Sequence, residues 1–257
     1  MRKYIKTMLI EIKLVFNYRF SVMWNSTMLV VPLLGYTFLF KKLFSQDFSF
    51  GDYELNTIFT YYFWALFLYT IVPAYAWSDM ADNIESGSIC YFLSKPYSFL
   101  LHYYFQILGA SILWIILNFL PLIPFILFFH KLFIFPNLKD LLIGILFFII
   151  SYNLALIFGF ILQLTTFYIG KPYGYFSIYG WIIGLLGGEI IPVDILPKFF
   201  NHLPFRFLYF IPSKGFMGKL ENIHILILEG FLYIIIFGFI LYLLWKNGLK
   251  KYTTFGG

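Results

Sequence analysis

The side chains that could perform catalysis or bind a metal are few and scattered. They are Cys90, His102, His130, His202 and His224. The cysteine has no metal-ligand partner at a useful spacing, and the histidines lie near the ends of apolar runs. The chain contains neither a His-Glu-x-x-His nor a Gly-x-Ser-x-Gly motif. We therefore expect no catalytic residue, no metal site and no enzyme activity in this chain.

Two short sequences share one feature with a phosphate-binding loop. They are Gly170-Lys171-Pro172 and Gly218-Lys219-Leu220. Each lacks the earlier glycine of that loop and the Ser or Thr that follows its lysine. We expect no nucleotide site here, so if ATP drives this protein, another chain must bind the ATP.

The composition is that of a protein with several membrane spans. Of 257 residues, 61% are apolar, 24% are aromatic and only 12% are charged, and the mean hydropathy is +0.83. Soluble proteins carry about 25% charged residues. The basic residues behind the net charge of +6 flank apolar runs and form no patch for nucleic acid. The sequence therefore predicts an all-α membrane protein.

Six apolar runs are long enough to cross a bilayer, which takes about 20 residues of helix. They are Val22–Phe40, Thr57–Trp77, Tyr103–Phe129, Leu141–Tyr168, Phe176–Ile191 and Ile225–Trp245. Pro121 and Pro124 predict a kink or an early exit in the third run. Lysines and arginines concentrate in the two tails, which predicts that both termini are cytoplasmic and that the protein lies in the plasma membrane.

Residues 1–20 show the pattern of an amphipathic helix that lies in the membrane surface. At 100° per residue its apolar side chains fall on one arc of about 140°. They are Tyr4, Ile5, Met8, Leu9, Ile12, Val15 and Phe16. Lys3, Lys6 and Lys13 lie on the opposite side and favour contact with membrane lipid. The alternative is a basic segment that only fixes the orientation of the first span.

The segment after the fifth run, residues 188–212, is moderately apolar but interrupted by prolines and charges. Irregular backbone at membrane depth persists only where it is buried in protein or faces water. We therefore expect a re-entrant helical hairpin here, between the fifth and sixth spans. The residues that define it are Gly188, Glu189, Pro192, Pro197 and Pro204. The alternative is an ordinary external loop.

The loop after the second run, residues 78–96, combines regularly spaced acids with apolar side chains. Three acids recur at every third position, a glycine then ends or bends the helix, and three apolar residues follow. In this order they are Asp79, Asp82, Glu85, Gly87, Tyr91, Phe92 and Leu93. In a helix the acids spread over about 120° of one side. The alternative is a solvated acidic linker.

Three segments of the chain together resemble one family. Residues 78–96, with Glu85-Ser86-Gly87 and Leu93-Ser94-Lys95-Pro96, resemble the cytoplasmic coupling segment of type-2 ABC exporter permeases. Gly187-Gly188-Glu189-Ile190-Ile191-Pro192, followed by Leu196-Pro197 and Leu203-Pro204, resembles the re-entrant pattern of that family. Trp245–Tyr252 resembles the tail of its six-span branch. Glu189 departs from the pattern, because a small residue is usual there.

The resemblance implies that residues 1–257 form one transmembrane domain, half of an export path for a bulky, partly apolar cargo. In this family the cargo is a lipid, glycan, peptide or drug. A second permease, identical or related, supplies the other half. A dimer of separate ABC ATPase subunits, which hold ATP and Mg²⁺, docks on the coupling segments. The alternative function is a membrane module without transport, such as an assembly or immunity factor.

Overall fold

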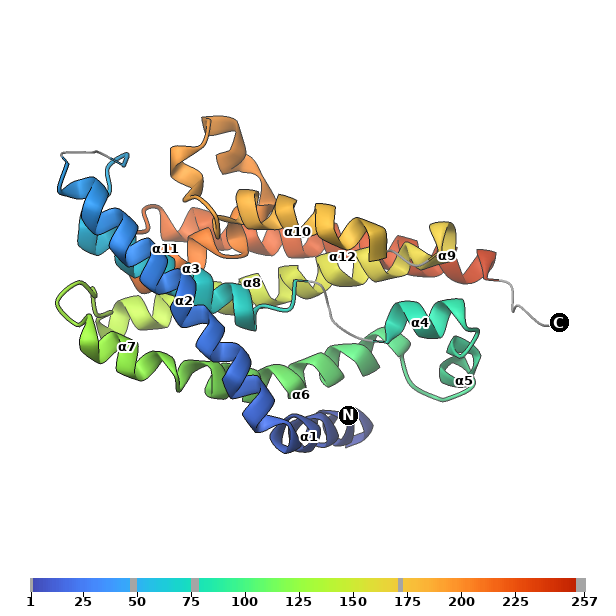
Figure 1. The fold of residues 1–257 in the computed structure, drawn as a ribbon. Helices are drawn as coiled ribbons and strands as arrows, with labels where there is room; N and C mark the ends of the chain where they lie inside the picture. The colour runs from blue at the N-terminus through green and yellow to red at the C-terminus, as the bar shows by residue number, and fades with distance from the viewer. Residues whose placement is uncertain (1, 47–49, 75–78, 171–172, 253–257) are drawn as a thin grey trace.

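The computed structural model describes residues 2–46, 50–74, 79–170 and 173–252, and this part of the chain is helical without strands (Figure 1). The longer helices are α1 Arg2–Asn17, α2 Arg19–Phe44, α3 Leu55–Ile71, α6 Phe99–Phe119, α8 Leu138–Leu164, α10 Tyr173–Gly187 and α12 Ile223–Lys251. The shorter helices are α4 Met80–Glu85, α5 Ile89–Leu93, α7 Leu122–Phe128, α9 Thr166–Ile169 and α11 Phe210–Phe216. The 3₁₀ turns are η1 Val193–Ile195, η2 Lys198–His202 and η3 Pro204–Phe207. The prediction of an all-α protein is confirmed.

Four helical stretches are long and apolar enough to cross a membrane. They are Arg19–Phe44, Phe99–Phe128, Leu138–Ile169 and Ile223–Lys251. They coincide with the first, third, fourth and sixth predicted spans. The third is broken between α6 and α7 at Leu120–Pro121, as its prolines predicted.

The other two predicted spans contain shorter helices. α3 has 17 residues and α10 has 15, which correspond to lengths of about 26 Å and about 22 Å. The predicted end of the second span at Trp77 was wrong, since α3 ends at Ile71. Pro73 explains this end because it lacks an N–H and disfavours a helical conformation at Val72. Residues 75–77 of that prediction lie outside the described part.

The long helices run between two ends of the molecule and alternate in direction (Figure 1). The helices α4, α5 and α9 lie at the same end as the C-terminus. The turns η1 and η2 and the described residues between α2 and α3, 45–46 and 50–54, lie toward the other end. α3 is the central element, because its side chains from Ile58 to Leu68 are buried without interruption.

The N-terminal helix α1 is separate from α2 and packs across α6. Gly109 of α6 permits this crossing, because a Cβ there would lie only 2.4 Å from the carbonyl oxygen of Met8. The ring of Tyr4 stacks on Phe105 with centroids 5.4 Å apart. The opposite face exposes apolar side chains such as Leu9, as a helix in contact with lipid requires.

The re-entrant helical hairpin predicted between α10 and α11 is not confirmed, because this segment contains no α-helix before α11. In its place the chain makes three 3₁₀ turns, and α11 follows at Phe210. The break begins at Gly188, whose φ of +93° is a conformation that favours glycine. Residues 193–210 therefore form no continuous helix.

Candidate functional site

The predicted coupling segment forms two short helices that are anchored on one side. Its first residue, Ser78, lies outside the described part. Met80, Ile84 and Ile89 are buried against side chains of α6 and α8. Two polar contacts fix α4 further: the backbone N–H of Ala81 donates to Gln163 Oε1 (3.2 Å), and Asn83 Nδ2 donates to the hydroxyl of Tyr103 (2.6 Å). The segment is thus held firmly to the bundle.

The three acids of this segment differ in their surroundings. Asp79 precedes α4 and is exposed, Glu85 ends α4 and is also exposed, and Asp82 in the first turn is half-buried. A carboxylate in the first turn interacts favourably with the helix dipole, which gives Asp82 a structural role. Asp79 and Glu85 are therefore the acids that a partner could reach most easily.

Gly87 separates the two short helices. Its φ is +82°, and its N–H donates to the carbonyl of Ile84 at 3.4 Å. The hydroxyl of Tyr252, just after α12, lies 3.4 Å from the position of a Cβ at Gly87 and 4.0 Å from Cys90 Sγ. The bend between α4 and α5 is therefore in contact with the end of the last long helix.

The three apolar residues do not act as one patch. Tyr91 and Leu93 are 61% and 45% exposed. Phe92 instead faces the bundle, where its ring lies 5.4 Å from those of Phe99 and His102. The sequence grouped all three as contact residues, because spacing alone does not show which side of a five-residue helix faces the bundle. The structure leaves Tyr91 and Leu93 as the outward apolar pair.

At the opposite end, two neighbouring tyrosines of α3 hold the start of the hairpin segment, residues 188–212. Tyr61 donates its hydroxyl to the carbonyl of Gly188, and Tyr62 donates to the carbonyl of Ile190 at 2.9 Å. Glu189 between them is half-buried, and its N–H donates to the carbonyl of Gly184 at 3.0 Å. This polar network positions Glu189 at the end of α10.

The three prolines singled out by the sequence stand at the starts of the three 3₁₀ turns. Pro192 and Pro197 directly precede η1 and η2, and Pro204 is the first residue of η3. The fixed φ of proline and its missing N–H suit the first position of a turn. They explain why this apolar segment breaks repeatedly.

Two ion pairs that the sequence did not reveal join the hairpin segment to other elements. Asp194 lies 2.9 Å from Lys214 Nζ and accepts a hydrogen bond from the Tyr53 hydroxyl at 2.9 Å. Burial, reinforced by the charge of Asp194, raises the pKa of Tyr53, so this hydroxyl stays protonated and donates. Arg206 pairs with Glu229 of α12. The sequence feature that could have indicated these ion pairs is the presence of charged residues within apolar stretches.

The partner of Arg206 is Glu229 of α12, to which its guanidinium donates. The Tyr233 hydroxyl extends this contact: it lies 2.8 Å from the carbonyl oxygen of His202 and 3.1 Å from Glu229 Oε1, and its one hydrogen can donate to either. Among the described residues, no group of three His, Cys, Asp or Glu could hold a metal ion.

The comparisons with known proteins give one result. The sequence profile of a family described as ABC-2 family transporter protein matches residues 30–256. No match was found among curated proteins or among solved structures. The matched region contains the coupling segment, the hairpin segment and every long helix from α3 onward. The chain is therefore a membrane protein of the ABC-2 transporter family.

Proposed function

We propose that this protein is the permease subunit of an ATP-driven exporter and docks on a separate ATPase through α4 and α5. The observation that carries this proposal is the two-sided character of that segment. Its inner side is buried in the bundle, while Asp79, Glu85, Tyr91 and Leu93 are exposed at one end of the molecule. A movement of an ATPase bound to the exposed side of α4 and α5 would therefore be transmitted directly to α6 and α8.

The proposed topology has six spans, with both termini in the cytoplasm and the protein in the plasma membrane. It is supported by the alternating directions of α2, α3, α6, α8, α10 and α12 (Figure 1). α3 is shorter than a full span, but it is buried, and irregular backbone beyond its end is tolerated where protein covers it. In this topology the hairpin segment enters the membrane from the outer side.

The assembly that we propose contains two permeases and two ATPases. α12 exposes large apolar side chains such as Leu228 and Ile235 along its length, which suits contact with lipid or with a second permease. ATP and Mg²⁺ would be held by the ATPases, and this chain would contain no catalytic site. A bundle rich in aromatic side chains suits a bulky, partly apolar cargo such as a lipid, glycan, peptide or drug.

Co-purification tests this function against the alternative of a membrane module without transport. The tagged permease is expressed with the ABC ATPase encoded in a neighbouring reading frame, solubilised in mild detergent and captured. We expect stoichiometric recovery of the ATPase and stimulation of its ATP hydrolysis by the permease. Recovery of the permease without any genomically adjacent ATPase would favour an assembly or immunity factor.

A further inference from the structure

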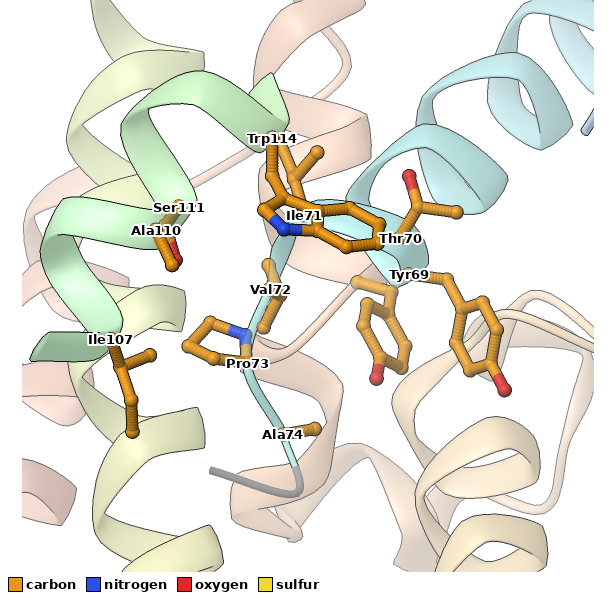
Figure 2. A pocket seen from close by; sticks show the side chains of 11 residues that line it. Tyr69, Thr70, Ile71, Val72, Pro73, Ala74, Ile107, Ala110, Ser111 and Trp114 are labelled. Carbon is orange, nitrogen blue, oxygen red and sulfur yellow. The ribbon is translucent and has the colours of Figure 1, made fainter. Parts of the chain in front are cut away.

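A cavity of about 460 Å³ lies where α3 ends beside α6 (Figure 2). This volume lies within the range of sites for drug-sized molecules, about 300–1,000 Å³. Figure 2 shows α6 side chains, among them Ile107 and Ser111, on one side of the extended segment 72–74, with Tyr69 and Thr70 on the other. Tyr209, just before α11, completes the wall.

The C-terminal end of α3 places a partial negative charge beside this cavity. Pro73 has no N–H, and the N–H of Ala74 donates to the carbonyl of Val72 at 2.8 Å. The carbonyl of Thr70 therefore has no helical donor. The C-terminal end of a helix carries a partial negative charge, about half an elementary charge. None of the described residues that line the cavity is charged, so none of them neutralises this end.

The side chains of the cavity favour a cation over an anion. The rings of Tyr69, Trp114 and Tyr209 line it, and aromatic faces attract cations. The two aliphatic hydroxyls in the wall already have partners within the protein: Thr70 Oγ1 donates to the carbonyl of Phe67 at 2.7 Å, and Ser111 Oγ accepts from the Tyr152 hydroxyl at 3.0 Å. The remaining wall is aliphatic.

We propose that this cavity binds a monovalent organic cation with an apolar, aromatic body. The aliphatic and aromatic wall would hold the body, and the end of α3 with the aromatic faces would hold the charge. This inference goes beyond the proposed function, because the described residues that line the cavity include none of the outward residues of α4 and α5. Cation binding to this cavity and ATPase docking on α4 and α5 can therefore be refuted independently of each other.

The test measures binding of tetraphenylphosphonium to the full-length permease in lipid nanodiscs by equilibrium dialysis, with empty nanodiscs subtracted. Tetraphenylborate, an anion of nearly the same size and shape, is the matched probe. We expect saturable binding of the cation at one site per chain and no saturable binding of the anion. Equal binding of both probes, or no saturable binding of the cation, would overturn the proposal.

A pair of variants locates the site. Ala110→Leu adds volume in the wall of the cavity, whereas Ile116→Phe adds volume on the same helix at a side chain that is 52% exposed. We expect cation affinity to fall by at least about tenfold in the first variant and to change less than about twofold in the second. Unchanged affinity in Ala110→Leu would place the cation elsewhere and refute the assignment. The charge comparison on the unaltered protein decides the matter even if that variant fails to fold.

Discussion

Arg206 and Glu229 illustrate how single charges hold the hairpin segment to α12. Their side chains are only 14% and 21% exposed, so each charge depends on the other for compensation. Arg206 belongs to η3 and Glu229 to the long helix α12. The pair thus connects an irregular segment to a long helix, and the Tyr233 hydroxyl adds a hydrogen bond to Glu229 or to the carbonyl of His202.

Removing one partner of this pair should cost more than removing both. Arg206→Met leaves Glu229 without its cation, and we expect a loss of roughly 2 kcal/mol, less than for a fully buried pair. The double variant Arg206→Met/Glu229→Met should recover at least half of that loss, because no unpaired charge remains. Thermal unfolding in detergent measures both. Additive losses in the double variant would show that the pair contributes no coupling.

At the scale of single residues, the sequence predicted which residues break the helices better than it predicted which way side chains face. The prolines of the hairpin segment were recognised, and each begins or precedes a turn. The inward position of Phe92 was not, because it depends on rings of a different helix, those of Phe99 and His102 in α6. The partner of Arg206 was missed for the same reason: Glu229 is 23 residues away. Contacts between elements are not encoded in local spacing.

At the scale of elements, the crossing of α1 and α6 depends on the absence of a side chain at one position. Gly109 allows the backbone of Met8 to approach, with a Cβ contact of 2.4 Å to its carbonyl oxygen if alanine replaced the glycine. α6 cannot relieve this clash by moving one flexible side chain, since the obstacle is backbone. The two helices would have to separate.

Gly109→Ala should therefore loosen α1 from the bundle and destabilise the protein by about 1–3 kcal/mol, the usual cost of overpacking. Gly238→Ala in α12 is the matched control, because nothing lies within 4 Å of its Cβ position. There the helix propensity of alanine should give no loss, or a gain of up to about 1 kcal/mol. Limited proteolysis between α1 and α2, together with thermal unfolding, checks both. Equal behaviour of the two variants would refute the role of Gly109.

The long elements could be predicted from apolar run length, and their breaks only in part. α2, α8 and α12 follow from hydropathy, and Pro121 marks the end of α6. The end of α3 was predicted too late because a count of apolar residues passes over Pro73. The 3₁₀ turns of the hairpin segment were expected as helices. The hydrogen bonds from Tyr61 and Tyr62 that hold the start of this segment, at Gly188 and Ile190, are not specified by local sequence either.

At the scale of the whole molecule, the proposed topology places the coupling and hairpin segments on opposite sides of the membrane. Cysteines at Lys95 and Lys198, introduced separately in a Cys90→Ser background, test it with a membrane-impermeant maleimide. Whole cells should label position 198, and position 95 should label only after permeabilisation. Residue 250, near the C-terminus, should behave like position 95. Labelling of position 250 in intact cells would contradict the six-span topology.

The central claim is that the outer side of α4 and α5 docks on an ATPase, and pull-down of that ATPase by two variants tests it most directly. Tyr91→Glu/Leu93→Glu places charges on the exposed pair, whereas Phe199→Glu alters a 70% exposed aromatic residue at the other end. Buried apolar anchors carry most of the affinity of an interface. We predict that the double variant inserts normally but recovers the ATPase at least about tenfold less well, while Phe199→Glu recovers it fully. Recovery of the ATPase at the wild-type level by Tyr91→Glu/Leu93→Glu would contradict the docking of the ATPase on this segment.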